Sequence, residues 1–598
     1  MDLAAARGEL AVLEFDDEVL DLIFRLGLGH EVDYLELLQQ RHVDVVVIPE
    51  KDPHDPDRDL DVSIRAQLTV EAMRAGAQVI YQATFLHDGY RGHADFLIRA
   101  ERPSGLGRWS YDVADTKLAR RMKVAALLQM AEYGRHLERI QGCPPRTLSV
   151  VTGDGAERTF KYVDAATYAQ RATGRLRRAV EHPAPTVPQP NAHCAQCRWS
   201  RRCESGWRAA DHLSLVAFMR TDHRELLEGA GIATVEKLAA SDPVALPLEI
   251  GSSARCRLQA QAVLQVLERR SGTPCYELLG SAPGLGLLRL PEPSSGDVYL
   301  DFEGDPYAEG GEGREYLAGL WDRDGSFTAW WAHTVGEERE LTRDLLAELN
   351  RRLDADPGMH IYHYAPYERS ALARLTQRHG VAETAFDRLL RSERLVDLYA
   401  VVRQGLRISK GSYSLKKLEA FYWGAVRGSN TQNDDVADAL SSVVAYEKWL
   451  VERADPAILS AIRQYNRDDC RSTHDLHAWL EQRRTELEQR DGPQARPPAP
   501  AVAPTLTLSD AEQAEADLAD RLNLVGEPLL AALVGWHRRE LRPQWWDYFR
   551  VDELSDEELS GTGQRSASSA HPPRPARSPA RRSTGTPSPR RTASSGTS

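Results

Sequence analysis

A lysine and two aspartates form the first group of residues whose types and spacing could do chemistry. Asp115 and Lys117 stand two positions apart at the end of a predicted strand (110–115), so their side chains project from one face of it. Asp95 lies in the preceding predicted strand, 92–98. Two carboxylates can hold Mg²⁺ or Mn²⁺ through oxygen, while an ammonium group stabilises phosphate charge or orients an attacking water. The trio suits phosphodiester hydrolysis, although Asp-x-Lys is by itself a weak signal.

Three other residues could complete this site. Gln129 and Tyr133 stand four apart on a predicted helix (122–141) and so share a face. His30 lies in an earlier helical pattern, 20–40, and could offer an imidazole to the same metal. Taken alone, each part of the group has an ordinary reading. His30 could be a locally satisfied histidine, Gln129 and Tyr133 the polar edge of a helix, and the Asp115–Lys117 pair a surface ion pair worth under about 1 kcal/mol. Their order along the chain favours the active-site interpretation.

A second acidic group lies near the middle of the chain. Asp301 and Glu303 project from one face of the strand pattern VYLDFEG. Tyr465 and Asp469 occupy positions i and i+4 of a predicted helix, where a phenol can position water beside a metal-bound carboxylate. Glu368 follows a strand between these two motifs and could add a carboxylate. These residues predict a second metal site with its own water-activating group.

A further aspartate, Asp397, stands in LVDLYAVV after the next predicted strand. The resemblance described below for the second acidic group implies a further acid at this place. An aspartate just before a helix is also a common N-cap, and we favour that reading.

Three cysteines, Cys194, Cys197 and Cys203, crowd into ten positions. Thiolates at this spacing bind Zn²⁺ or an iron–sulfur cluster. The other four are expected to be small buried residues: Cys143, Cys256, Cys275 and Cys470.

The elements that must position these groups predict a multidomain α/β chain. Strand patterns at 43–48, 79–85, 92–98, 110–115 and 147–151 alternate with the two helical patterns, and the Pro-rich stretch 181–190 ends this unit. A helical connector follows, in which 226–240 resembles a helix-hairpin-helix element, although a plain helical linker is the favoured reading. The expected divisions are a nuclease domain with its cysteines (1–213), the connector (214–288), a second α/β domain (289–490), a Pro/Ala linker (491–506), a helical segment (507–560) and a disordered Ser/Arg/Pro tail (561–598).

Charge and composition limit the partners. The net charge is −13, and the tail from 561 to 598 holds seven arginines and no acid, so the remaining 560 residues sum to −20. A protein that holds nucleic acid by bulk charge would be basic, so any nucleic-acid contact must be local. The start of the chain lacks a signal-type basic region, and no stretch is apolar enough to span a membrane. We expect a cytoplasmic protein.

The motifs of residues 1–213 resemble those of the RecB-like branch of PD-(D/E)XK nucleases. The resemblance rests on helix residue His30, GHAD ending in Asp95, DTK at 115–117 and Gln-x-x-x-Tyr at 129–133. It implies a restriction-endonuclease-like fold and a metal-dependent DNA nuclease. More broadly, residues 1–490 resemble proteins in which such a domain is fused to a YprB-like exonuclease domain of the ribonuclease H fold.

The second constellation resembles the DnaQ-like DEDDy exonucleases, whose chemistry uses two metal ions. Glu368 departs from the usual aspartate by one methylene, which puts metal spacing there in doubt. In iron–sulfur members of the RecB-like branch, three cysteines join a fourth from far upstream, whereas this chain has none before Cys143. A truncated start, a replacement ligand such as His193, or a site that no longer binds a cluster would each explain this. We favour a [4Fe–4S] site, intact or relict, over zinc.

The expected function is a metal-dependent nuclease that uses Mg²⁺ or Mn²⁺ on DNA ends or single strands in repair or recombination, with DNA favoured over RNA. The alternatives are a non-catalytic nucleic-acid-binding scaffold for a partner helicase and an RNA-directed exonuclease. Related longer chains continue into a superfamily 1 helicase, and 507–558 resembles its lead-in. This chain has no Gly-x-x-x-x-Gly-Lys-[Ser/Thr] loop, so we expect no ATPase in it, and its Ser/Arg tail looks like an out-of-family ending.

Overall fold

The computed structural model divides the chain into two compact units, Met1–Leu506 and Thr507–Ser598. The boundaries expected within the first unit stay predictions. The structure describes residues 1–11, 18–41, 44–52, 55–120, 122–184, 186–191, 193–194, 197–280, 282–423, 439–452, 455–498, 501–502 and 509–553.

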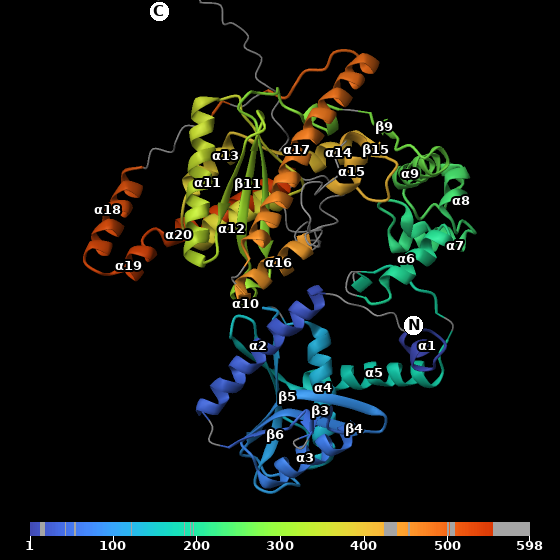
Figure 1. Ribbon diagram of the computed structural model, residues 1–598, viewed down its shortest axis with the longest axis vertical. Helices are drawn as coiled ribbons and strands as arrows, with labels where there is room; N and C mark the ends of the chain where they lie inside the picture. The colour runs from blue at the N-terminus through green and yellow to red at the C-terminus, as the bar shows by residue number, and fades with distance from the viewer. Residues whose placement is uncertain are drawn as a thin grey trace, which may run out of the picture. The chain divides into compact units, whose positions relative to one another are not determined.

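A six-stranded mixed sheet forms the N-terminal part, with strand order β1-β4-β5-β6-β7-β8 (Figure 1). The pairs β1–β4 and β6–β7 are parallel, and the other three neighbouring pairs are antiparallel. Parallel neighbours need a crossover connection, and α4 makes it between β6 and β7. The strands are β1 (Val45–Val47), β4 (Val79–His87), β5 (Tyr90–Ala100), β6 (Ser110–Lys117), β7 (Thr147–Thr152) and β8 (Glu157–Lys161), and the helices are α1 (Asp2–Ala6), α2 (Glu18–Arg41), α3 (Val62–Ala75), α4 (Val124–Gln141), α5 (Tyr162–Glu181) and α6 (Ser200–Ala209).

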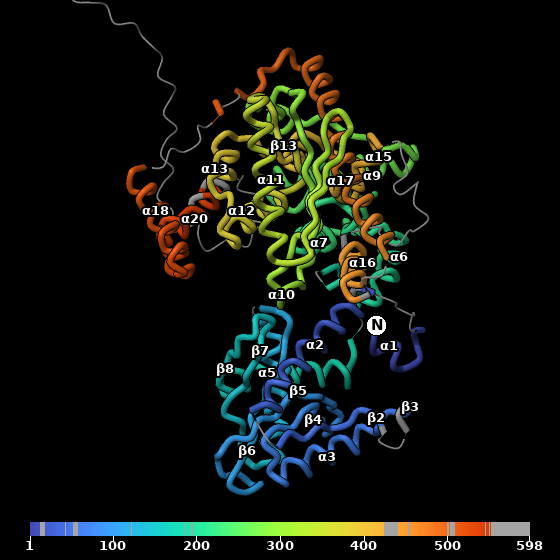
Figure 2. The backbone as a smooth tube through the Cα atoms, turned by 60° about the vertical axis from the view of Figure 1, so that its left-hand side comes forward, coloured from blue at the N-terminus to red at the C-terminus, as the bar shows by residue number. Residues whose placement is uncertain are grey.

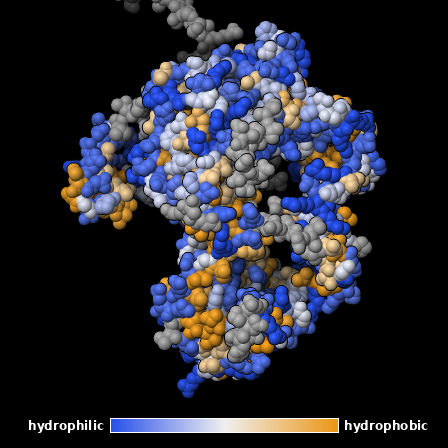
Figure 3. All heavy atoms as spheres, in the orientation of Figure 1, coloured by the Kyte–Doolittle hydropathy of each residue, from blue (hydrophilic) through white to orange (hydrophobic). Residues whose placement is uncertain are grey.

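All five strand patterns expected here are confirmed. The sequence did not predict β8, whose side chains are mostly exposed, or the short pair β2 (Lys51–Asp52) and β3 (Asp55–Asp59). The core packs buried residues of the sheet, such as Phe85 and Tyr111, against α3 and α4. In Figure 3, hydrophobic residues gather on the face that carries α2, where Phe24 and Leu28 are exposed.

Short helices connect the two sheets, as the sequence predicted. They are α7 (Thr221–Gly229), α8 (Val235–Ala240) and α9 (Ser252–Ser271), and they surround a core of their own. The turn between α7 and α8 contains Gly231 at φ +80°, a conformation that favours glycine. The side chain of Thr234 then caps α8.

A five-stranded sheet with order β12-β11-β10-β13-β14 forms the second α/β part. The first three strands pair antiparallel, whereas β13 and β14 run parallel to β10. In Figures 1 and 2, α11 and α12 lie on one side of this sheet and α17 on the other. The strands are β10 (Val298–Asp305), β11 (Arg314–Asp322), β12 (Phe327–Trp331), β13 (Ile361–His363) and β14 (Leu395–Asp397), with β9 (Tyr276–Leu278) paired to β15 (Leu406–Ile408) nearby. The helices are α10 (Ala308–Gly311), α11 (Val335–Ala355), α12 (Tyr367–His379), α13 (Glu383–Arg391), α14 (Leu398–Gly405), α15 (Leu415–Tyr422), α16 (Ala439–Glu452) and α17 (Pro456–Asp491).

The long helix α17 is anchored at its C-terminal half by buried arginine contacts. Arg484 is 1% exposed and donates hydrogen bonds to the carbonyls of Leu287 and Gln494 at 2.9 Å each. The following segment folds back on the helix, because Arg496 bonds Glu481 at 2.6 Å and the carbonyl of Pro291 at 2.7 Å. The first part of the expected 491–506 linker is therefore held against the domain and is not a free spacer.

The second unit is helical over its described residues, as expected for 507–560. It contains α18 (Asp510–Leu524), α19 (Pro528–Leu533) and α20 (Trp536–Glu553), and a capping box between Ser509 and Glu512 starts α18. The expected disordered tail, 561–598, lies outside the described residues. Within the described part of the chain, no helix combines the length and the apolar character needed to cross a bilayer.

Arg496→Ala should destabilise the protein by about 1–3 kcal/mol at pH 7, because it leaves the largely buried Glu481 without its main partner. Burial opposes the shift, yet hydrogen bonds from Arg496 and His477 lower the pKa of Glu481 to about 2. A carboxyl whose folded-state pKa is depressed stabilises the fold above its unfolded pKa and loses this effect as the pH falls. The difference between parent and variant in urea unfolding should therefore shrink from pH 6 to pH 2.

Arg490→Ala is the matched control, since Arg490 is exposed and pairs with the neighbouring Asp491. An equal loss of stability in both variants, or a difference that does not change with pH, would contradict the proposed role of Arg496.

Candidate functional site

The structure brings Asp95, Asp115 and Lys117 together on adjacent strands of the N-terminal sheet. Lys117 forms an ion pair with Asp115, which is 2% exposed. Asp95 accepts hydrogen bonds from the backbone N–H and the hydroxyl of Thr116, at 2.8 and 2.9 Å. Burial and the neighbouring Asp95 raise the pKa of Asp115 to about 7, although Lys117 opposes the rise. A divalent cation here would relieve the repulsion between the two carboxylates.

Gln129 and Tyr133 lie over the same strands. The Gln129 amide donates a hydrogen bond of 2.7 Å to the Tyr133 hydroxyl. The ring of Tyr133 packs against Gly92, so closely that a Cβ on this glycine would lie only 2.7 Å from the ring. Burial raises the pKa of Tyr133 to about 12, with smaller contributions from Asp115 and Asp95. The motif Gly-His-Ala-Asp therefore supplies both a carboxylate and the space for the tyrosine.

His30 contacts the edge of this group through the backbone. Its Nε2 lies 3.3 Å from the carbonyl oxygen of Val151, which pairs with Thr116 in the sheet. A histidine held by a backbone carbonyl keeps a fixed ring orientation and its second nitrogen for another partner. Its role as a metal ligand stays a prediction.

Glu31, the residue after His30, is one that the sequence reasoning missed. It accepts a hydrogen bond from Gln82. Burial and then the charge of Asp95 raise the pKa of Glu31, while Lys117 lowers it. Gln82 has φ +56°, a left-handed conformation that is rare for a residue with a side chain. The position of Glu31 directly after His30 was the available signal. Nothing in the sequence marks the unusual backbone at Gln82.

The cysteine cluster lies beside the first residues of the chain. The Sγ of Cys203 is 3.8 Å from the sulfur of Met1, and Asp2 accepts hydrogen bonds from Arg198 at 2.6 Å and from Trp199 at 2.9 Å. Burial raises the pKa of Cys203, and the nearby Cys197 and Cys194 raise it further. The cluster therefore joins both ends of residues 1–213. Its metal stays a prediction.

The other cysteines are not uniformly buried. Cys470 is buried, Cys143 and Cys275 are half-buried, and Cys256 is exposed, so the expectation was wrong for Cys256. It lies on α9, a helix that exposes much of its surface.

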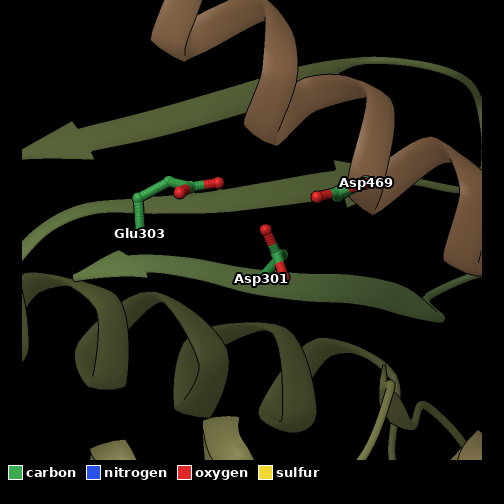
Figure 4. A group of neighbouring side chains, drawn as sticks. All are labelled: Asp301, Glu303 and Asp469. Carbon is green, nitrogen blue, oxygen red and sulfur yellow. The ribbon is translucent and has the colours of Figure 1, made fainter. Parts of the chain in front are cut away.

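Three carboxylates of the second sheet face one another (Figure 4). Asp301 and Glu303 come from β10 and Asp469 from α17, and one oxygen of each lies within 4.8 Å of the other two. Among the described residues, this is the one group of His, Cys, Asp or Glu that brings three ligand atoms so close. Oxygen ligands in such number suit Mg²⁺ or Mn²⁺, so the donor set fits a divalent cation.

Asn466 sets the position of Asp301, and sequence reasoning missed it. Its amide donates a hydrogen bond of 2.7 Å to the Asp301 carboxylate, and the residue is fully buried. It reaches the strand because Gly319, the partner of Asp301 in the β10–β11 ladder, has no side chain. A Cβ on Gly319 would overlap the Asn466 carbonyl oxygen and lie 2.9 Å from Phe327. The sequence signal for Asn466 was its position three residues before Asp469, which places both side chains near one another on the helix.

Glu303 is buried deepest of the three. Burial raises its pKa well above the ordinary value, and the charge of Asp469 raises it further, while hydrogen bonds with Ser442 and Asn466 act in the opposite direction. Ser442, on α16, also lies 2.7 Å from the hydroxyl of Tyr316. Glu303 thus favours its protonated form until a cation compensates its charge.

One comparison with known proteins decides the nature of this part of the chain. Residues 298–481 match the model of the RNase_H superfamily. The ribonuclease H-like domain includes all three carboxylates and the whole five-stranded sheet. Searches of curated proteins and of solved structures gave no significant match.

Glu368 lies near the three acids of the ribonuclease H-like domain but pairs with a histidine. Its carboxylate is 3.4 Å from Nδ1 of His363, at the end of β13. Burial alone would lower the pKa of His363, but the hydrogen bond and charge of Glu368 raise it. The charges of Asp301, Asp469, Glu303 and Glu368 all add to the effect of burial in raising the pKa of Cys470. Glu368 thus shares the electrostatic environment of the triad, and its role as a ligand stays a prediction.

Asp397 is the N-cap of α14, as the favoured reading had it. Its carboxylate accepts hydrogen bonds from the backbone N–H groups of Tyr399 at 2.8 Å and Ala365 at 2.9 Å.

Tyr465 is nearly buried on α17, one helical turn before Asp469. The ammonium group of Lys416 lies 5.0 Å from the centre of its ring. Lys416 belongs to the first turn of α15, which Glu419 holds to α17 by accepting a 2.8 Å hydrogen bond from Ser472. A positive charge therefore stands beside a site built of carboxylates, where it can attract a phosphate group.

Gly319→Ala should destabilise the protein by about 1–3 kcal/mol, because the new methyl group overpacks against Asn466 and Phe327. It should also displace the amide that orients Asp301 and so weaken Mg²⁺ binding, measured by titration calorimetry. Gly336→Ala is the control, since a Cβ there meets nothing nearer than 3.9 Å. Unchanged stability and Mg²⁺ affinity in Gly319→Ala would show that Asn466 does not depend on this glycine.

Proposed function

We propose that the ribonuclease H-like domain is a metal-dependent exonuclease that hydrolyses phosphodiester bonds in nucleic acid. The observation that carries this proposal is the group of three carboxylates, Asp301, Glu303 and Asp469, within 4.8 Å inside a domain that matches this superfamily. Repulsion between carboxylates held this close, one of them buried, favours the binding of a cation that compensates their charge. Membership of the superfamily supports a nuclease, and the acid set supports a working one.

Asp301, Glu303 and Asp469 would hold the divalent metal. When bound, Mg²⁺ or Mn²⁺ would supply an activated water and compensate the charge that develops on the phosphate oxygens. The chain itself orients the acids: Asn466 fixes Asp301, and Ser442 and Asn466 bond Glu303. Glu303 must lose its proton when the metal binds, so metal affinity should rise with pH.

Tyr465 is the residue that we assign to positioning the attacking water. Its place on α17, one turn before Asp469, supports this role, and the ammonium group of Lys416 lies over its ring. A neutral phenol is a poor Mg²⁺ ligand beside carboxylates, so its hydroxyl serves the water and not the metal.

We also propose that residues 1–213 form a second nuclease site on a restriction-endonuclease-like fold. The ion pair between buried Asp115 and half-buried Lys117, the neighbouring Asp95 and the Gln129–Tyr133 hydrogen bond support it. The acid pair would hold Mg²⁺ or Mn²⁺, and Lys117 would stabilise phosphate charge. The choice of DNA over RNA, a role in repair or recombination, a helicase partner and a [4Fe–4S] cluster at the cysteines all stay predictions of the resemblance.

Asp301→Asn and Asp115→Asn should each abolish one component of metal-dependent cleavage, and the double variant should have none. The measurement is the product length from labelled single-stranded and duplex DNA and RNA, with Mg²⁺ or Mn²⁺ and with EDTA. Asp387→Asn is the control, since this partly exposed acid lies on α13 and pairs with Arg391. If the parent cleaves no substrate, the chain is instead a nucleic-acid-binding scaffold.

Tyr465→Phe should lower exonuclease turnover by about 10² to 10⁴, the usual range for a residue that positions or activates water. The ring and its packing remain, so Mg²⁺ affinity and the free energy of unfolding should stay close to those of the parent. Single-turnover kinetics with saturating enzyme isolates the chemical step. Turnover equal to the parent would remove Tyr465 from the mechanism.

A further inference from the structure

Three arginines form a row on the solvent side of α17, the helix that also carries Tyr465 and Asp469. Arg463, Arg467 and Arg471 stand at positions i, i+4 and i+8, and so follow one stripe of the helix with about 6 Å of rise between neighbours. The buried face of α17, which includes Tyr465 and Asn466, points toward the sheet. At 100° per residue, each arginine lies about 120–160° around α17 from Tyr465 and Asp469, so the row faces away from the catalytic carboxylates on the same rigid element.

Each arginine of the row lies over an aromatic ring from a neighbouring segment. The guanidinium carbon is 5.0 Å from the ring of Phe327 for Arg463, 5.5 Å from Trp321 for Arg467 and 5.2 Å from Trp423 for Arg471. These contacts hold the long side chains in place and lower the entropy that binding would otherwise cost. The N–H groups of a guanidinium held in this way can still bind phosphate oxygens.

The row is short of counter-charges. Within the described part of the chain, neither Arg463 nor Arg467 has a carboxylate oxygen within 4.0 Å, whereas Arg471 is 3.7 Å from Asp475. Asp468, the nearest acid in sequence to Arg467, accepts a hydrogen bond from Gln464. In a chain with a net charge of −13, such a stripe is a local attractive site for a polyanion.

We propose that the arginine row binds the phosphate backbone of single-stranded nucleic acid on the side of α17 that faces away from the exonuclease site. A single row along one helix can follow one backbone, whereas a duplex presents two. Proteins that bind single strands combine cationic groups with aromatic or guanidinium surfaces on which bases stack. The inference rests on the proposed function, because it gives this surface to the substrate of that domain.

Fluorescence anisotropy with a labelled single-stranded DNA of about 16 nucleotides tests the proposal. The experiment uses the full chain with Asp301→Asn and Asp115→Asn together, so that neither proposed nuclease site cleaves the probe. Replacing Arg463, Arg467 and Arg471 together by glutamine should weaken binding at least about tenfold. It should also flatten the slope of log affinity against log salt by about two, since each phosphate contact to a single strand contributes about 0.7. Single-stranded RNA should behave in the same way.

Arg483→Gln is the matched control. Arg483 lies on the same helix, 4.9 Å from the ring of Tyr276 and 5.2 Å from that of Trp479, but it is also paired with Glu486 at 3.0 Å. Its replacement should leave binding unchanged. A triple Arg→Lys variant keeps the charges, so it should retain most of the salt slope even if the aromatic contacts and the stability suffer.

The outcomes separate the two proposals. Parent-like affinity and salt slope in the folded triple Arg→Gln variant would overturn the arginine row, as would tighter binding of a blunt duplex than of the single strand. Loss of binding in that variant, together with no metal-dependent cleavage by the unsubstituted chain, would support the row and overturn the exonuclease. Metal-dependent cleavage by the Asp115→Asn chain, which keeps only the Asp301 site, with no effect of the arginines on binding would do the reverse.

Discussion

The repulsion between Asp301, Glu303 and Asp469 is the constraint on which the ribonuclease H-like domain depends. Three acids within 4.8 Å can share a partly buried space only if some stay protonated or a cation joins them. The fold supports these acids with hydrogen bonds from neutral side chains. Asn466 donates to Asp301, Ser442 bonds Glu303, and Gly319 leaves room for the Asn466 side chain. The repulsion between the acids lowers the stability of the fold locally, but it leaves a set of metal ligands in place before the metal binds.

The two acid sites of the chain solve the same problem in different ways. In the N-terminal sheet, Lys117 supplies a fixed positive charge to Asp115, so the site keeps part of its compensation when no metal is bound. In the second sheet, a neutral amide orients one of the acids, since Asn466 donates a hydrogen bond to Asp301.

Sequence patterns predicted most of the secondary structure and the acids of both sites, because period-two and i, i+4 spacings survive folding. Asp301 with Glu303, and Asp115 with Lys117, share strand faces as alternation requires. The patterns missed residues whose role depends on contacts distant in sequence. Asn466 matters only because Gly319 is opposite Asp301, and Glu31 only because Gln82 adopts a left-handed backbone. They also missed β8, whose exposed residues carry no alternating signal.

The 36 residues of α17 form one uninterrupted helix about 54 Å long, and this makes its register an all-or-none variable. A slip of one residue would turn every side chain by about 100° and remove Asp469 from the other two acids. The contacts that forbid such a slip include the hydrogen bonds of Arg484 with Leu287 and of Glu481 with Arg496, three to four turns beyond the site. The position of Asp469 relative to Asp301 and Glu303 is therefore fixed partly by contacts near the C-terminal end of the helix.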